Sequence, residues 1–232
     1  MWALAALLLP QQAAGAVTLQ VLPGAPVNPH LFGYNLEEWG SPLNLTFNDT
    51  AGLALAEALH PGVLRYPSGT GSNIWDTIKG QFVPAPSDNP GGYNGWETIL
   101  APPVNSRPVG TFSGASFLAG LGGKAKSTVW ALNVYSLSTA ESCAQIEYIS
   151  KLPGQQEPGV LLELGNELYS AAQGMPQYPN STVYAEAMIP IVACVRRLMP
   201  KAKVGACGLS EFGWNVGVRA PGSSPRPLNR LS

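Results

Sequence analysis

The fold expected for this chain follows from residues 160–169, which read Val-Leu-Leu-Glu-Leu-Gly-Asn-Glu-Leu-Tyr. The first five residues form a short, mostly aliphatic run that predicts a β-strand, and Gly165 ends it. Asn166 and Glu167 follow where the strand stops. By itself, an Asn-Glu pair could equally mark the start of a loop or a helix cap. At the C-terminal end of a barrel strand, however, a carboxylic acid occupies the usual catalytic position, so Glu167 is the first catalytic candidate.

Strands and helices alternate on both sides of this segment. The predicted strands cover residues 31–36, 63–66, 127–133, 160–164 and 203–207, and the predicted helices cover residues 51–59, 113–121, 139–152 and 181–199. This alternation predicts a parallel sheet with helical crossovers, either a doubly wound open sheet or a (β/α)8 barrel. The strands read as continuous apolar runs, so we expect both of their faces to be buried. Thr139 is the expected cap of the third helix, and Pro190 predicts a kink or break in the fourth.

A long connection, residues 67–108, separates the second strand from the next helix and is expected to be a functional loop. It begins with Ser-Gly-Thr-Gly-Ser-Asn, whose small residues let backbone approach a ligand closely. Thr70, Asn73 and Asp76 offer hydroxyl, amide and carboxylate partners for sugar hydroxyls. A phosphate-binding loop is excluded because the Gly-Lys-Ser/Thr ending is missing. An ordinary glycine-rich turn is the alternative.

Glu163 lies within the predicted strand, two and four residues before Gly165 and Glu167. Because side chains alternate along a strand, it faces the same side as these two residues. A carboxylate inside a barrel is costly unless it is paired. Arg65, near the end of an earlier strand, is the expected partner, and we hypothesise that this ion pair orients the site.

Several segments carry sequence motifs. They are Arg-Tyr-Pro-Ser-Gly-Thr from Arg65 with Trp-Asp at 75–76, Trp-Ala-Leu-Asn at 130–133, Leu-Glu-Leu-Gly-Asn-Glu at 162–167 and Asn-Pro-His-Leu-Phe-Gly-Tyr-Asn at 28–35. Together these segments resemble the heparanase-like enzymes of glycoside hydrolase family 79, in clan A. The resemblance spans roughly residues 20 to 210, although arabinofuranosidases of the same clan share parts of these motifs. Where the family often continues with Pro-Asn, this chain has Leu-Tyr at 168–169.

The resemblance implies a retaining hydrolase of β-glycosidic bonds in glycans or glycoconjugates, most simply a β-glucuronidase. Glu167 would be the general acid/base and Asn166 its sugar-binding neighbour. The matched segments supply the remaining substrate-binding candidates, which are Asn35, Arg65, Thr70, Asp76 and Asn133.

The chain of 232 residues is expected to hold only the first five strands and four helices of such a (β/α)8 TIM barrel. Residues 1–16 are predicted to be a signal peptide, 17–210 the N-terminal part of the barrel, and 211–232 an irregular tail. The family's nucleophile lies on a late strand, so we expect it to be absent, and Glu211 does not match it. The chain would then be inactive or incomplete without a C-terminal half.

Export is the expected destination, either to the extracellular space or to an endomembrane lumen. Residues 2–9 are apolar and are followed by Ala-Gly-Ala at 14–16, which suits cleavage by signal peptidase. Asn44, Asn48 and Asn180 each begin a glycosylation triplet. No later stretch is long enough for a membrane-spanning helix.

Composition excludes several partners. The net charge of -1 creates no broad field that would attract nucleic acid or an anionic membrane. No cofactor is expected, and the two histidines and the lack of a Cys-x-x-Cys motif argue against a metal site. Three cysteines, Cys143, Cys194 and Cys207, leave at least one thiol unpaired within the chain.

Two other functions stay open. A non-catalytic half-barrel could bind carbohydrate or a partner protein, with sugars stacking on exposed Trp39, Trp75, Tyr93 and Trp96. The second open function is that of an enzyme with an open α/β sheet and unrelated chemistry, although the sequence has no Gly-x-Ser-x-Gly nucleophile motif to support it.

Overall fold

The computed structural model describes residues 32–36, 50–67, 69–86, 101–170 and 177–208. The signal peptide, the tail and the triplets at Asn44 and Asn48 lie outside these residues, as do Glu211, Trp39, Tyr93 and Trp96. The elements, in chain order, are β1 (Gly33–Asn35), α1 (Thr50–Ala58), β2 (Val63–Tyr66), the 3-10 helix η3 (Thr70–Ile74), β3 (Trp75–Asp76), β4 (Gln81–Phe82), α2 (Ala101–Asn105), α3 (Gly114–Gly120), the 3-10 helix η5 (Gly122–Lys124), β5 (Ser127–Leu132), α4 (Thr139–Ser150), β6 (Leu161–Leu164), α5 (Ser181–Leu198) and β7 (Lys203–Ala206).

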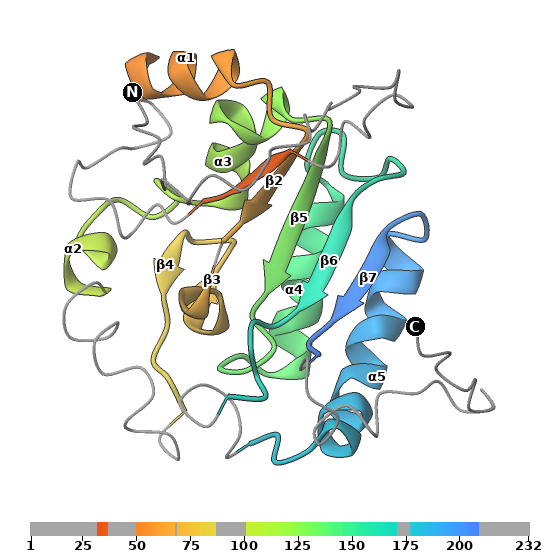
Figure 1. Ribbon diagram of the computed structural model, residues 1–232. Helices are drawn as coiled ribbons and strands as arrows, with labels where there is room; N and C mark the ends of the chain where they lie inside the picture. Colours follow the sequence, from red (N-terminus) through yellow and green to blue (C-terminus); the bar gives the residue numbers. More distant parts are fainter. Residues whose placement is uncertain (1–31, 37–49, 68, 87–100, 171–176, 209–232) are drawn as a thin grey trace, which may run out of the picture.

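The main sheet has five strands in the order β1-β2-β5-β6-β7, and every neighbouring pair is parallel. Helices α3, α4 and α5 all lie behind the same face of it (Figure 1). The predicted parallel α/β architecture is therefore confirmed. A doubly wound sheet reverses its strand order at a switch point, whereas these five strands follow the order of the chain.

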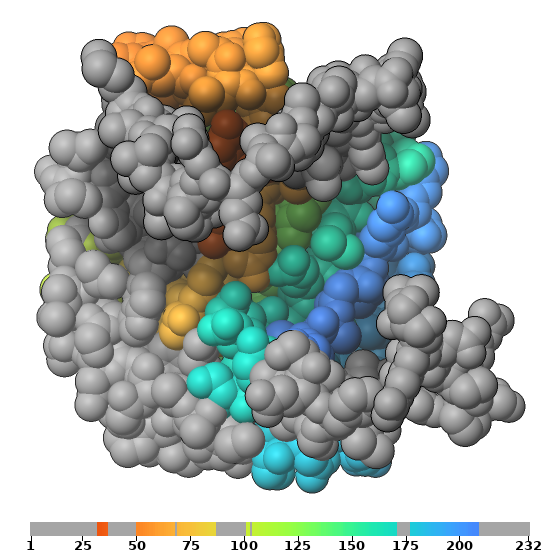
Figure 2. Space-filling model, in the orientation of Figure 1, coloured from red at the N-terminus to blue at the C-terminus, as the bar shows by residue number. Residues whose placement is uncertain are grey.

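Burial alternates along β2 and β6. On β6, Leu162 and Leu164 are buried against the helices, whereas Leu161 and Glu163 are only half-buried. Figure 2 shows the opposite face, where atoms of β2, β5, β6 and β7 line a hollow. The prediction that both faces are buried therefore holds at the end of β5, where Trp130, Ala131 and Leu132 are all buried, and is wrong for β2, β6 and β7.

An aromatic cluster forms the core between β2, β5 and α3. Tyr66 stacks on Phe117 with ring centroids 4.6 Å apart, and the Trp130 ring meets both of them edge-on. Tyr66 also donates a hydrogen bond to the Phe112 carbonyl. Aromatic pairs of this kind stabilise a core by roughly 0.5–1.5 kcal/mol beyond their area burial.

The segment expected as one long loop is partly ordered into η3, the antiparallel β3–β4 pair and α2. Trp75, expected to be exposed for sugar stacking, is instead completely buried and packs edge-on against Phe82. The pairing of Trp75 with Phe82 in the two short strands turns the indole into the core. Trp75 is thus a core residue and not a stacking platform.

Local sequence sets the ends of α4 and α5. Ser138, and not Thr139 as predicted, caps α4, and it forms a reciprocal capping box with Glu141. Its hydroxyl and backbone N–H both bind the Glu141 carboxylate, which lowers the pKa of Glu141. Helix α5 continues unbroken through Pro190, which lies on its exposed side.

Cys143 on α4 and Cys194 on α5 form a disulfide, with their Cα atoms 5.8 Å apart. Cys207 is a free, buried thiol, as the odd number of cysteines predicted. The bond joins the two helices that lie behind β6 and β7 (Figure 1).

Candidate functional site

The carboxyl end of β6 makes a turn with two residues in the left-handed region. Gly165 has φ +84°, and a Cβ there would lie 2.4 Å from the Leu168 Cδ1 atom. Glu167 has φ +46° and is exposed. A non-glycine residue in this region costs about 1–3 kcal/mol and persists only where its surroundings hold it. Such strain at an exposed carboxylate is a recognised mark of a functional site.

Arg65 is the centre of the polar cluster beside this turn. Its Nε donates to Glu163 Oε2 at 2.6 Å, which confirms the predicted ion pair. Its Nη1 donates to Asn35 Oδ1 at 3.0 Å, and its Nη2 donates to Asn166 Oδ1 at 3.1 Å. The guanidinium therefore joins β1, β6 and the turn after β6. Three of the sequence-predicted candidates, Asn35, Arg65 and Asn166, are in direct contact.

The reach of Arg65 to Glu163 depends on a small residue between them. The two residues belong to β2 and β6, and β5 runs between these strands. Ala131 on β5 is the register partner of Glu163. A methyl group at that place leaves room for the guanidinium to cross β5, whereas a long side chain on the same face would obstruct it.

Asn73 forms hydrogen bonds to the backbone of Asn166, whose side chain is bound by Arg65. Its Nδ2 donates to the Asn166 carbonyl at 2.7 Å, and the Asn166 N–H donates to its Oδ1 at 2.9 Å. Asn73 is completely buried, and each buried hydrogen bond of this type contributes about 1 kcal/mol. The amide expected to meet a sugar hydroxyl thus fixes the peptide groups that precede Glu167. Sequence reasoning missed this role, since a contact across 93 positions leaves no local signal.

Asn133 lies at the end of β5, almost fully buried. Its Nδ2 donates to Ser136 Oγ at 2.7 Å and to the Trp75 carbonyl at 3.2 Å, and its Oδ1 accepts from Tyr135 N–H and Ser136 N–H. The Ser136 N–H also donates to the Asn73 carbonyl at 3.3 Å. Asn133 therefore supports the loop that holds Asn73, and its predicted sugar contact stays a prediction.

Asp76 and Thr70 are not part of the Arg65 cluster. The Asp76 Oδ1 accepts from the backbone N–H groups of Ile78 and Lys79, and its Oδ2 lies 3.1 Å from Lys79 Nζ. These contacts shape the turn between β3 and β4. Thr70 is the half-buried first residue of η3. Substrate contacts by either residue stay predictions.

Two tyrosines not expected from the sequence contribute to the site. Tyr169 OH donates to Glu167 Oε1 at 3.3 Å, and burial together with the nearby Glu167 carboxylate raises the pKa of Tyr169. Tyr184 OH donates to the Leu164 carbonyl at 2.8 Å and accepts from the Cys207 N–H at 3.0 Å. Burial raises the pKa of the Tyr184 phenol and of the Cys207 thiol. Tyr184 thereby links α5 to the carboxyl ends of β6 and β7.

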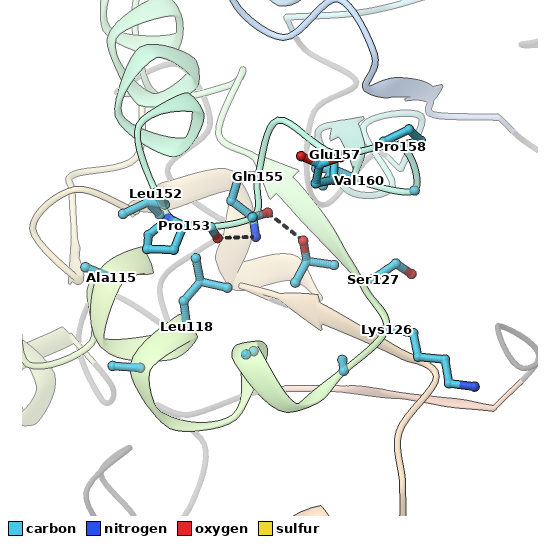
Figure 3. Close-up of a pocket in the computed structure, with 17 residues that line it drawn as sticks. Ala115, Leu118, Lys126, Ser127, Leu152, Pro153, Gln155, Glu157, Pro158 and Val160 are labelled. Carbon is cyan, nitrogen blue, oxygen red and sulfur yellow. Dashed lines mark hydrogen bonds between the residues drawn. The ribbon is translucent and has the colours of Figure 1, made fainter.

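A cavity of about 650 Å³ lies at the other end of the sheet, where β5 and β6 begin (Figure 3). Gln155 is buried in its wall, where its Oε1 accepts from Thr128 Oγ1 at 2.7 Å and from Trp130 Nε1 at 2.8 Å. The rest of the lining is mainly small and apolar, and it includes none of the predicted site residues. The Arg65 cluster and Glu167 lie at the opposite, carboxyl end of the strands.

Among the described residues, no group of three or more His, Cys, Asp or Glu side chains is placed to hold a metal ion. Within the same part of the chain, no helix is long and apolar enough to cross a membrane. Comparison of the whole chain with protein-family models, curated proteins and solved structures finds no match.

Proposed function

We propose that this chain is the N-terminal part of a (β/α)8-barrel glycoside hydrolase that cleaves β-glycosidic bonds with retention, and that Glu167 is its general acid/base. The observation that carries the proposal is the exposed Glu167 carboxylate, in a strained turn at the carboxyl end of a parallel strand. Catalytic groups of barrel enzymes occupy this position. Five parallel strands in chain order, with helices on one face, also match the wall of a barrel.

In the first step, Glu167 protonates the glycosidic oxygen of the leaving group while a second carboxylate attacks the anomeric carbon. In the second step, Glu167 takes a proton from the water that hydrolyses the glycosyl-enzyme. The second carboxylate would have to lie about 5–5.5 Å away. We propose that a late strand, which is not among the residues of this chain, supplies it.

The Arg65 cluster offers hydrogen-bonding groups to a sugar. Arg65 and Glu163 neutralise one another, and Asn35 and Asn166 provide amide groups beside them. Amide and guanidinium groups can donate hydrogen bonds to hydroxyl oxygens. We propose a β-glucuronide as substrate because of the resemblance to heparanase-like enzymes.

The test is hydrolysis of an aryl β-glucuronide by the natively secreted protein and its Glu167→Gln variant. Glutamine keeps the shape but can neither donate a proton to the leaving group nor take one from water, so we expect a loss of turnover of roughly 10²- to 10⁴-fold. Glu186→Gln is the matched control, because Glu186 is an exposed acid on α5 and should leave hydrolysis unchanged. Equal activity in wild type and Glu167→Gln would refute the role of Glu167.

The intact mass of the secreted, deglycosylated protein decides which chain carries the activity. A mass far above 24.4 kDa would identify a longer polypeptide that contains the remaining strands. A mass at or below that value would favour the alternative, a non-catalytic half-barrel that binds carbohydrate or a partner protein.

One observation favours that alternative. Phe32 and Tyr34, at the β1 edge of the sheet, are 63% and 43% exposed. Exposed aromatics at a sheet edge are suited to stacking on a sugar or a partner. Saturable glycan binding that is equal in wild type and Glu167→Gln, without turnover, would support it.

A further inference from the structure

Asn73 contacts Asn166 through both ends of its amide. Because Nδ2 binds the Asn166 carbonyl and Oδ1 binds the Asn166 N–H, one side chain holds the peptide groups on both sides of the Asn166 Cα atom. The Asn166 carbonyl belongs to the peptide bond whose nitrogen is that of Glu167. The orientation of this peptide determines where the Glu167 side chain starts.

We propose that Asn73 is a positioning residue for Glu167, acting through the backbone of Asn166. The inference rests on the proposed role of Glu167 as general acid/base. A strained backbone keeps one conformation only where its surroundings hold it, and the turn has positive φ at both Gly165 and Glu167. Asn73 holds the one residue between them.

Asn73 is itself firmly placed. It is completely buried in η3, and its carbonyl accepts the Ser136 N–H at 3.3 Å. The loop after β2 and the loop after β5 therefore both support the turn after β6. A proton donor must be held within hydrogen-bond reach of the leaving oxygen, and small displacements from that place reduce the rate strongly.

Only a primary amide fits this arrangement. Asparagine presents one donor and one acceptor side by side, which complements the C=O and N–H of a single residue. Aspartate has two acceptors, so Asn73→Asp keeps the bond from the Asn166 N–H and loses the bond to the Asn166 carbonyl. Asn73→Ser removes most of the contact without adding charge, and it tests the same point if the aspartate variant fails to fold.

Asn105 provides a matched control. It makes the same two-way contact with another backbone, since the Phe82 N–H donates to its Oδ1 at 2.9 Å and its Nδ2 donates to the Phe82 carbonyl at 3.0 Å. This contact joins α2 to β4 and includes no residue of the candidate site. Asn105→Asp therefore reproduces the chemical change without affecting the turn before Glu167.

The experiment compares kcat/KM of the natively secreted protein on two β-glucuronides, one with an alkyl leaving group and one with 4-nitrophenol. The alkyl leaving group needs full protonation and 4-nitrophenol needs little. We expect Asn73→Asp or Asn73→Ser to lose roughly 100-fold on the alkyl substrate and less than about 10-fold on the nitrophenyl substrate. Asn105→Asp should change kcat/KM by the same factor on both substrates. Equal losses on both substrates in the Asn73 variants would overturn the proposal.

A second readout does not depend on turnover. The carboxyl carbon of Glu167, labelled with ¹³C and assigned by its absence in Glu167→Gln, is observed by NMR at one fixed pH. We expect its chemical shift to change in the Asn73 variants and not in Asn105→Asp. An unchanged Glu167 chemical shift would overturn the proposal even if the protein hydrolyses no glucuronide. Absence of hydrolysis with a changed chemical shift would count against the proposed function alone.

Discussion

Removing the disulfide between α4 and α5 should destabilise the chain substantially. The bond closes a loop with a sequence separation of 51 residues. In the chain-entropy model, closing a loop of that length removes about 14 cal/mol/K from the unfolded ensemble, which corresponds to about 4 kcal/mol at 25 °C. The Cys143→Ala/Cys194→Ala double variant should therefore lose about 4 kcal/mol of unfolding free energy.

The assay is urea unfolding at neutral pH, followed by circular dichroism. The dependence of the free energy on urea should also increase in the double variant, because an uncrosslinked unfolded chain exposes more surface. Wild-type protein in a reductant is the control, since it keeps both side chains and loses only the bond. Its destabilisation should match that of the double variant.

Thiol counting must accompany the unfolding curves. Denatured wild-type protein should show one reactive thiol, that of Cys207, and three after reduction. If the bond is present by this count and its loss costs less than about 1 kcal/mol in both experiments, the loop-closure reasoning is refuted.

Two further predictions concern the site and its supports. Arg65→Ala should cost roughly 2–3 kcal/mol, less than a fully buried pair because the Arg65 and Glu163 side chains are 21% and 29% exposed. Adding Glu163→Gln should recover part of that loss, and a coupling below about 0.5 kcal/mol in the double-mutant cycle would contradict the ion pair. Burial raises the pKa of Tyr178 to about 12, above its ordinary value of 10, and its hydroxyl donates to the Val134 carbonyl. The contribution of Tyr178 to the unfolding free energy is therefore fully present below pH 10. It should fall by up to about 3 kcal/mol as the pH rises to 12. If the unfolding free energy falls equally in wild type and Tyr178→Phe over this range, the prediction is wrong.

The positions of the main elements could be predicted because their signals are local. The strand at Val63–Tyr66 was predicted with its bounds, and the strand before Glu167 to within one residue. Apolar runs, caps and the Pro or Gly residues that end helices act within a few positions of one another. The pairing of Arg65 with Glu163 was also predictable. The side of the strand that Glu163 faces follows from its position in the strand, and a buried carboxylate is costly unless it is paired.

The burial of Trp75 and the role of Asn73 could not be predicted in this way. The burial of Trp75 depends on the turn that pairs it with Phe82, and the role of Asn73 depends on a backbone 93 positions later. An amide that binds sugar and an amide that binds backbone look alike in a sequence. The same applies to the choice of Cys194 as the partner of Cys143.

The sequence alone therefore determined that strands and helices alternate, that the sheet is parallel, and that a carboxylic acid follows the β6 strand. Only the tertiary structure decided which sheet face is covered, which cysteines pair, and what holds the turn that carries Glu167. The physical reason is the distance along the chain over which each interaction acts. Backbone preferences and amphipathic periods act between near neighbours in the chain, whereas hydrogen-bond partners and packing contacts are set by which distant segments the fold brings together.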